Sequence, residues 1–349
     1  GLSIQVTLFC AGIGTLLFHL MTRFKVPAFL GSSFAFLGGF GTVANLDTGI
    51  FADMSMGDKL PYACGGVVVA GVLYLILAVI IKMVGVKRAM HFLPPVVTGP
   101  IIICIGLSLA PSAVSNVQTN WLLAIVAFAI IVIFNIWGKG MFKIIPILLG
   151  IAGSYAVALI LHACGITNPD GSAIFDFAAV ASASWVDIPP FQLCKFNLTA
   201  ILAMAPIAVA SMMEHIGDIS AISATVGENF VEDPGLHRTL IGDGLATSIS
   251  ALFGGPANTT YGENTGVLEL SRVHDPKVIR LAACYAIVLS FIPKFAQIIS
   301  TMPIAIVGGV SFILYGMIAA IGLSQQPFLS ADSDFPTDLP SMWQEQASH

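Results

Sequence analysis

Long apolar segments alternate with short polar connections along most of the chain. A helix that crosses a bilayer needs about 20 largely apolar residues. Segments near that length follow one another from the first residues onward, so the pattern predicts an all-α polytopic membrane protein. We expect about nine spans, at residues 2–21, 62–81, 93–109, 121–137, 144–163, 198–223, 239–253, 278–299 and 304–323.

Two short segments, residues 29–43 and 258–272, interrupt this pattern. Each begins with small, hydroxyl and aromatic residues and carries glycines that are unusual in an ordinary span. Polar backbone at membrane depth must be buried in protein or line a cavity. Paired glycine-interrupted segments in the two halves of a transporter indicate its binding site. We therefore expect two facing half-helices, each preceded by a short extended strand.

The basic residues predict the orientation of the spans. If the side of Arg23 and Lys25 is cytoplasmic, all of the fourteen Lys and Arg residues except Lys59, Lys195 and Lys294 fall on that side. Short cytoplasmic loops enriched in Lys and Arg are what the positive-inside rule expects. The first broken segment then enters from the cytoplasm and the second from outside, which predicts an inverted repeat.

Composition supports a membrane protein and excludes other classes. The 349 residues are 56% hydrophobic and 9% charged, with a mean hydropathy of +0.91, whereas soluble domains carry about 25% charged residues. The net charge of −5 provides no basic patch for nucleic acid. The six cysteines have neither zinc nor disulfide spacing. No nucleophile–base pair, phosphate loop or metal constellation is evident, so we expect no enzyme, cofactor or metal.

Four carboxylates fall within the predicted membrane segments: Glu214, Asp218, Asp243 and Glu263. Such groups are costly in a membrane and are functional candidates by default. Glu214 and Asp218 share a helix face, although a helix end reaching cytoplasmic water is the alternative. Glu263 begins a half-helix, where the dipole alone favours a carboxylate, and Asp243 suits a structural role equally well. We expect His215 to face away and pack.

These groups suit a small planar ligand. The backbone N–H groups of Phe34 and Gly262, on the two extended segments, can donate to ring carbonyls. Glu214 and Glu263 can accept from ring N–H groups, while Phe34 and Tyr261 can offer ring faces. The set fits a lactam such as a nucleobase and suits a metal ion poorly. Further supporting residues are expected to be Asp243, Asn264 and Ser33.

Three stretches resemble one known family. They are Gly-Glu-Asn-Thr-Gly-Val-Leu-Glu-Leu-Ser-Arg at residues 262–272, Leu-Gly-Ser-Ser-Phe-Ala-Phe at 30–36 and Asp-Pro-Gly-Leu-His-Arg at 233–238. The first resembles the signature of the nucleobase–ascorbate transporters, a family of nucleobase:cation symporters, and the other two resemble its bacterial uracil permease branch. The resemblance implies fourteen segments in two inverted repeats of seven, and alternating-access transport of nucleobases coupled to protons.

The resemblance also implies a division into core and gate domains. The core would comprise residues 1–82 and 198–300, and the gate residues 83–164 and 301–323. Residues 165–197 would form an extracellular loop, and residues 324–349 a polar, disordered tail. Against the family, the first segment and the last two are missing, so the chain is expected to be incomplete. A homodimer in the bacterial inner membrane would follow if the gate is complete.

The resemblance leaves the substrate open. It assigns base recognition to Glu214 and Glu263, carbonyl recognition to the amides of Phe34 and Gly262, and a lining role to Tyr261. Uracil is the expected substrate, and Glu214 or Asp218 is the expected proton carrier, because two carboxylates one turn apart resist joint ionisation. The uracil pattern has His at Asp218 and Asn at Asp243, which leaves a xanthine/urate:proton symporter as the alternative. A sulfate or bicarbonate transporter would need a cationic site, and a truncated, non-transporting fragment is the third alternative.

Overall fold

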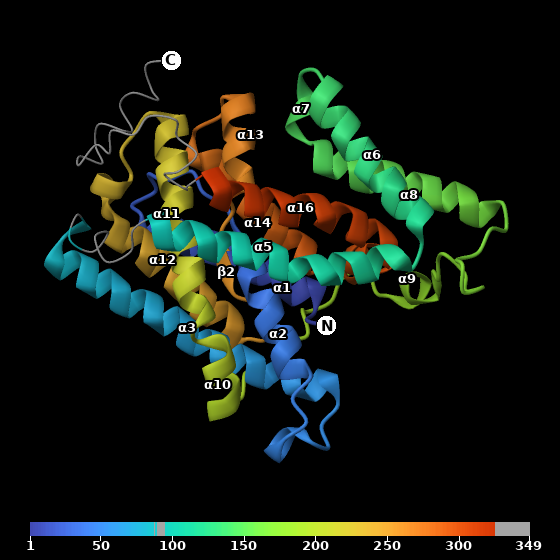
Figure 1. Cartoon of the computed structure of the whole chain (residues 1–349), viewed down its shortest axis with the longest axis horizontal. Helices are drawn as coiled ribbons and strands as arrows, with labels where there is room; N and C mark the ends of the chain where they lie inside the picture. Colours follow the sequence, from blue (N-terminus) through green and yellow to red (C-terminus); the bar gives the residue numbers. More distant parts are fainter. Residues whose placement is uncertain (87, 89–94, 325–349) are drawn as a thin grey trace. The chain divides into compact units, whose positions relative to one another are not determined.

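The computed structural model describes residues 1–86, 88 and 95–324 (Figure 1). The chain forms two compact units. Unit 1 comprises Gly1–Ile101, Pro189–Ser290 and the chain from Leu323 onward, and unit 2 comprises Ile102–Ile188 and Phe291–Gly322. The tail predicted at residues 324–349 lies outside the described residues, apart from Ser324 at the end of the last helix.

Helices dominate both units, as the sequence predicts. The elements of unit 1 in chain order are α1 (Ile4–Met21), β1 (Leu30–Ser32), the 3-10 turn η1 (Phe34–Phe36), α2 (Leu37–Ala44), the 3-10 turn η2 (Gly49–Phe51), α3 (Met56–Val84), the start of α5 (Pro95–Gln118), α10 (Leu198–Met204), α11 (Ile207–Val226), the π turn η3 (Val231–Gly235), α12 (Leu236–Leu252), β2 (Asn258–Thr260), α13 (Glu263–Ser271) and α14 (Pro276–Ser290). Unit 2 contains the rest of α5, then α6 (Trp121–Trp137), α7 (Met141–Ile144), α8 (Pro146–Ala163), α9 (Ala178–Ser182), α15 (Pro293–Ser300) and α16 (Ile304–Ser324).

The predicted spans occur as helices, with differences in length and continuity. In the described part of the chain, α1, α3, α8 and the pair α10–α11 are long and apolar enough to cross a membrane. Shorter apolar helical segments occur at Ile102–Gln118 within α5, Trp121–Trp137 (α6) and Ile304–Ala320 within α16. The chain is therefore a multi-pass membrane protein, as predicted.

The prediction of one continuous span at residues 278–299 is wrong. Helix α14 ends at Ser290, and a separate helix α15 begins at Pro293. Proline has no N–H to donate and disfavours helical geometry in the residue before it. Ile292 accordingly leaves the helical region, with φ −110° and ψ 88°. The chain therefore breaks where the sequence carries Pro293.

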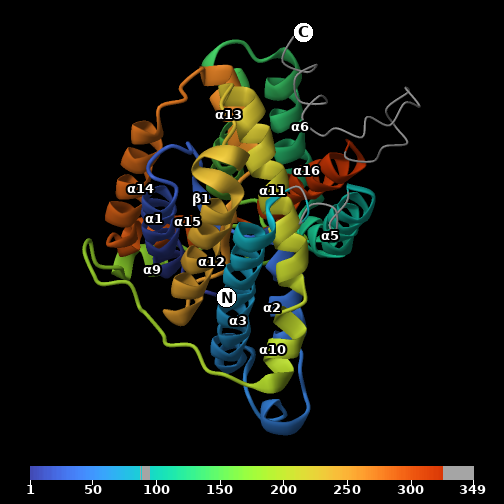
Figure 2. The same cartoon turned by 90° about the vertical axis from the view of Figure 1, so that its left-hand side faces the viewer.

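Helices α1, α3 and α12 of unit 1 pack side by side (Figure 2). Glycines allow this close packing, as small residues do in membrane helices generally. A Cβ on Gly71 of α3 would lie 2.7 Å from the carbonyl oxygen of Gly244 in α12, and one on Gly244 would lie 2.8 Å from the oxygen of Gly71. The α3–α12 crossing therefore has room for glycine alone at both positions.

The two broken segments meet in a two-stranded antiparallel sheet. Leu30 pairs with Thr260, Gly31 with Thr259 and Ser32 with Asn258. β1 runs into η1 and α2, and β2 runs into α13. Each strand therefore precedes a half-helix, and the antiparallel pairing agrees with the predicted inverted repeat.

Unit 2 has its own apolar core, formed by α6, α8 and α16. Leu123 and Ile131 of α6, Ala158 of α8 and Ile306 of α16 are almost completely buried there. A Cβ on Gly150 would lie 2.2 Å from the Ile131 side chain, so glycine allows α6 and α8 to pack closely.

Candidate functional site

The candidate site lies where the β1–β2 pair faces α11 and α12 within unit 1. The structure brings most of the predicted residues to this place. Phe34 opens η1, Tyr261 and Gly262 follow β2, and Glu263 is the first residue of α13. The side chain of Glu263 lies outside what the structure describes, so its predicted contact with a ligand stays a prediction.

The backbone positions of Phe34 and Gly262 differ from the prediction that both are extended. Phe34 begins the η1 turn, and Gly262 has helical angles of φ −59° and ψ −33° as the N-cap of α13. The N–H groups in the first turn of a helix have no intrahelical acceptor. Both residues therefore lie at the first turn of a helix, and not in extended backbone as expected.

Phe34 and Tyr261 form a stacked aromatic pair. Their ring centroids are 6.4 Å apart and the ring planes differ by 17°. The Tyr261 hydroxyl donates to the Ser32 carbonyl at 3.0 Å and lies 3.3 Å from the Ser32 hydroxyl. A Cβ on Gly31 would lie 2.5 Å from the Tyr261 ring. The absence of a side chain at Gly31 therefore lets the Tyr261 ring lie across β1.

One α11 carboxylate, that of Asp218, contacts β2. Glu214 and Asp218 are both partly buried. Thr260 of β2 donates its hydroxyl to Asp218 Oδ2 at 3.0 Å. A Cβ on Gly262 would lie 2.6 Å from Asp218 Oδ1, so the start of α13 is directly beside this carboxylate. Asp218 thus contacts the end of β2.

His215 is a candidate that the sequence prediction missed. It packs near Phe18, with ring centroids 6.3 Å apart, but its Nδ1 also lies 3.3 Å from Asp243 Oδ2 and 3.2 Å from the Thr260 hydroxyl. His215 and Asp243 are both 0% exposed. The available signal was a histidine beside Glu214 in a predicted membrane helix, since ionisable groups there seldom lack partners.

A continuous polar network links the site to α12. Thr259 donates to Asp243 Oδ2 at 3.2 Å, and Thr260 contacts both His215 and Asp218. The network therefore runs from Asp218 through Thr260 and His215 to Asp243. Nε2 of His215 and Oδ1 of Asp243 are buried and have no hydrogen-bond partner among the described residues.

Two supporting residues that were predicted lie at the edges of this arrangement. The Ser33 hydroxyl is 3.4 Å from the Ser211 hydroxyl of α11, and the Ser33 N–H donates to the Ala257 carbonyl. The Asn264 N–H donates to the Tyr261 carbonyl at 3.1 Å. These bonds fix the turns that follow the two strands. Among the described residues, no group of three or more His, Cys, Asp or Glu side chains could hold a metal ion.

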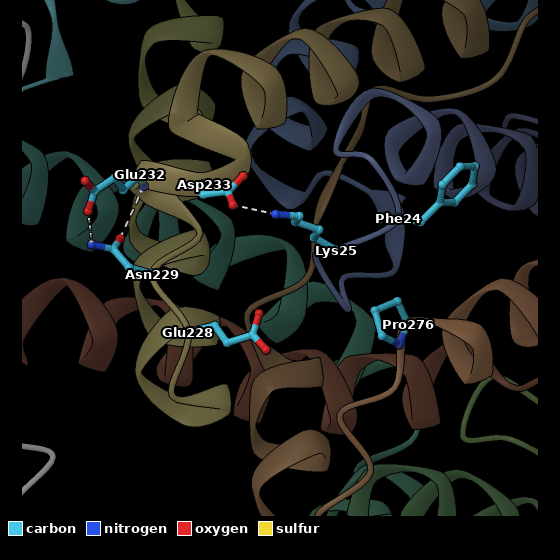
Figure 3. A pocket seen from close by; sticks show the side chains of 7 residues that line it. All are labelled: Phe24, Lys25, Glu228, Asn229, Glu232, Asp233 and Pro276. Carbon is cyan, nitrogen blue, oxygen red and sulfur yellow. Dashed lines mark hydrogen bonds and ion pairs between the residues drawn. The ribbon is translucent and has the colours of Figure 1, made fainter.

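A separate pocket of about 600 Å³ lies at the connections that precede β1 and α12 (Figure 3). Its walls include Phe24, Lys25, Glu228, Asp233 and Pro276, and it contains none of the predicted site residues. Lys25 forms an ion pair with Asp233 across it. The hydrogen bond from Lys25 lowers the pKa of Asp233 below its ordinary value. This pocket is open and charged, and it is distinct from the candidate site.

Comparison with known proteins identifies the family. A model of the Permease family, covering xanthine and uracil permeases, matches residues 2–334. The chain belongs to this family. The probable uracil permease of Haemophilus influenzae is 39% identical over 333 residues, covering 93% of this chain and 75% of that protein. The uracil permease of Bacillus caldolyticus is 38% identical, with 93% and 73% covered, and that of Escherichia coli K12 is 34% identical, with 89% and 70% covered.

Solved structures confirm the fold of this permease-family protein. The transmembrane domain of the cyanobacterial bicarbonate transporter BicA superimposes with a TM-score of 0.59 at 15% identity, covering 92% of this chain and 94% of that domain. SLC26A9 gives a TM-score of 0.59 at 11% identity, covering 91% and 57%. At this identity the likeness concerns the inverted-repeat fold alone. The family resemblance drawn from residues 30–36, 233–238 and 262–272 is likewise confirmed.

Proposed function

We propose that this permease-family protein transports nucleobases, with uracil as its substrate. The observation that carries the proposal is the juxtaposition, at the β1–β2 crossing, of a stacked Phe34–Tyr261 pair and the Asp218 carboxylate. Relatives named uracil permease at 34–40% identity support the substrate class.

Uracil matches the groups offered at the crossing. It is planar and carries two carbonyl acceptors and two N–H donors. In the proposed arrangement, the amides of Phe34 and Gly262 donate to the carbonyls, while Glu214 and Glu263 accept from the ring N–H groups. The rings of Phe34 and Tyr261 border the base. Every polar group of the base then has a partner, which burial at membrane depth demands.

Proton coupling is proposed to act through Asp218 or Glu214, supported by the network behind them. Carboxylates one turn apart resist joint ionisation, so one proton can reside on the pair. Thr260 joins Asp218 to His215, and His215 joins Asp243. A proton bound by Asp218 would therefore alter the hydrogen bonding of β2, the strand that leads to Gly262, and so couple protonation to base binding.

Alternating access is proposed to arise from movement of a gate against a core that carries the site. On this view unit 1 contains the site and unit 2 contributes to the gate. A homodimer in the bacterial inner membrane also stays a prediction, and it can be checked by the mass of the purified protein in a defined detergent.

The site is tested by thermal unfolding of the purified protein in the presence of uracil, xanthine, other nucleobases and bicarbonate. A ligand at 100 times its dissociation constant stabilises the folded state by about 2.7 kcal/mol. We expect uracil to raise the unfolding temperature most and bicarbonate to have no effect. No shift with any base would contradict the binding site, while a shift without uptake would contradict transport alone.

Coupling is tested by uptake of labelled uracil into proteoliposomes with an imposed proton gradient. Asp218→Asn keeps the shape of the side chain and can still accept from Thr260, but it cannot carry the proton. We expect it to bind uracil and to lose gradient-driven accumulation. The matched control, Asp233→Asn, removes an exposed carboxylate outside the site and should accumulate uracil normally. Full accumulation by the Asp218 variant would refute the assignment.

Xanthine is the second candidate substrate, because Asp218 and Asp243 are both acidic where the uracil pattern has His and Asn. Asp218 contacts Thr260, and Asp243 contacts His215. Both positions that differ from the uracil pattern therefore belong to the polar network of the candidate site. Competition of labelled uracil uptake by unlabelled uracil and by xanthine separates the two. Stronger inhibition by xanthine would reassign the substrate within the same class.

A further inference from the structure

An apolar groove with a basic rim lies at the turn between α6 and α7 in unit 2. It has a volume of about 280 Å³ and is lined by Ile133, Phe134, Trp137, Gly138, Lys139 and Phe142. Figure 1 shows α6 and α8 running beside one another, with the short α7 at the turn between them. The groove lies wholly within one unit and is separate from the candidate site.

The walls of the groove are aromatic and open to the surroundings. Phe134 and Phe142 stack with centroids 5.7 Å apart and an interplanar angle of 29°. Trp137 is 69% exposed and Phe142 55% exposed. Gly138, which ends α6, permits this geometry, because a Cβ there would lie 2.1 Å from the Phe134 carbonyl oxygen. The turn thus holds the Phe142 ring against the last turn of α6.

The basic residues at this turn form no ion pair within the described part of the chain. Lys139 and Lys143 are both exposed, and neither lies within ion-pair distance of a described carboxylate. The sequence contains no Asp or Glu between Asp58 and Asp170. The positive charge beside the groove is therefore not paired with any described carboxylate, and no acidic residue lies near it in sequence.

We propose that this groove binds an anionic phospholipid of the cytoplasmic leaflet. The apolar run of α6 ends at Trp137, and tryptophan is typical of the membrane interface. The charge-based orientation places Lys139 and Lys143 on the cytoplasmic side, where anionic headgroups attract basic residues. The volume is below the roughly 300–1,000 Å³ of pockets that enclose whole ligands, so the groove suits part of an acyl chain, with the phosphate outside near the lysines.

This inference requires only a membrane protein in the predicted orientation and does not rest on nucleobase transport. Zwitterionic lipid has no net negative charge, so it would satisfy the apolar walls but would leave the charge of the two lysines uncompensated. An anionic headgroup satisfies both. The groove is therefore expected to discriminate between lipids by headgroup charge.

The test titrates the purified protein in detergent with brominated phosphatidylglycerol or brominated phosphatidylcholine and follows quenching of tryptophan fluorescence. Each lysine contributes about 1 kcal/mol to attraction by anionic lipid, so replacing two predicts about a 30-fold loss of affinity. We expect Lys139→Gln/Lys143→Gln to lose phosphatidylglycerol affinity by that factor, and Lys139→Arg/Lys143→Arg to retain it. Trp137→Phe should remove much of the quenching.

The matched control is Lys82→Gln/Lys277→Gln, which removes two exposed lysines from the same predicted side. It should leave phosphatidylglycerol binding unchanged. Equal losses in the two double variants would show a general charge effect and overturn the site. Equal binding of the two lipids, quenching independent of Trp137, or a changed oligomeric state with unchanged lipid affinity would overturn it as well.

Discussion

The two broken segments that meet at the β1–β2 pair, residues 30–44 and 258–271, have similar backbones but different side-chain chemistry. Each is a three-residue strand followed by a helical turn. The first half, residues 30–44, contains no ionisable side chain, whereas the hydroxyls of Thr259 and Thr260 in the second half contact Asp243 and Asp218. The repeat therefore places two similar helical turns next to the paired strands, and the two turns differ in the polar side chains around them.

The difference extends to burial. All three residues of β2 are buried, while Ser32 at the end of β1 is partly buried. Buried hydroxyls beside carboxylates need defined partners, because an unmade hydrogen bond there costs about 1–3 kcal/mol. The first half should accordingly tolerate loss of the partly buried Ser32 hydroxyl, whereas the second half should not tolerate loss of the Thr259 or Thr260 hydroxyl. In the proposed function, the first half contributes shape and backbone donors, and the second half carries the proton chemistry.

The largest expected effect is at Asp243. Asp243→Leu leaves His215 buried without its carboxylate and should lower the free energy of unfolding by about 3–5 kcal/mol. Unfolding in mixed detergent micelles measures this loss. The double variant Asp243→Leu/His215→Leu should recover part of it, because His215 is no longer buried without its carboxylate, although the Thr259 hydroxyl still loses its acceptor. Additive losses would show that the two side chains do not act as a pair.

A second effect is expected at Gly31 in the first half. Gly31→Ala places a methyl group 2.5 Å from the Tyr261 ring, and such overpacking costs about 1–3 kcal/mol. Displacement of the ring should also weaken stabilisation by uracil. The matched control is Gly38→Ala in α2, where a Cβ meets no atom within 4 Å and helix propensity favours alanine by up to about 1 kcal/mol. Equal uracil responses in the two variants would contradict a positioning role for Gly31.

The two threonines of β2 should separate coupling from stability. Thr260→Val removes the hydroxyl between Asp218 and His215, at a cost of about 1–3 kcal/mol, and should impair gradient-driven uptake. Thr259→Val removes a bond to Asp243, which keeps its contact with His215, so uptake should fall less. Proteoliposome uptake and thermal midpoints measure both variants. A larger uptake defect in the Thr259 variant than in the Thr260 variant would contradict the assignment of proton coupling to the Thr260 hydroxyl.

The smallest expected effect is at Lys25 and Asp233, which join the connections before the two halves at the surface. The pKa of Asp233 is lowered, chiefly by the hydrogen bond from Lys25. Its stabilisation is thus present above the unfolded pKa of about 3.9 and is lost as pH falls through the folded-state pKa. Asp233→Asn should lower the thermal midpoint slightly at pH 7, and the difference from the unchanged protein should shrink as the pH falls below about 3.9. A difference that does not shrink with falling pH would exclude this ion pair as its cause.

Much of the candidate site could be predicted from the sequence, because polar residues are costly in lipid and therefore stand out within apolar segments. The interruptions at residues 29–43 and 258–272 and the carboxylates Asp218 and Asp243 were evident on that ground. The inverted orientation of the two broken segments followed from the number of spans and the distribution of Lys and Arg. These features depend on the cost of burying charge and backbone in lipid, which is a property of local sequence.

Tertiary structure decided which of these residues meet. The pairing of Leu30 with Thr260, the contact of His215 with Asp243, and the place of Gly31 beneath Tyr261 join residues far apart in the chain. Such contacts depend on the register of the strands and on helix crossings that differ by single residues. The sequence by itself determined that ionisable and extended groups lie within the membrane protein. Only packing decided their partners. Two residues become partners because they lie close in space, and the hydropathy pattern reports only where each residue lies along the chain.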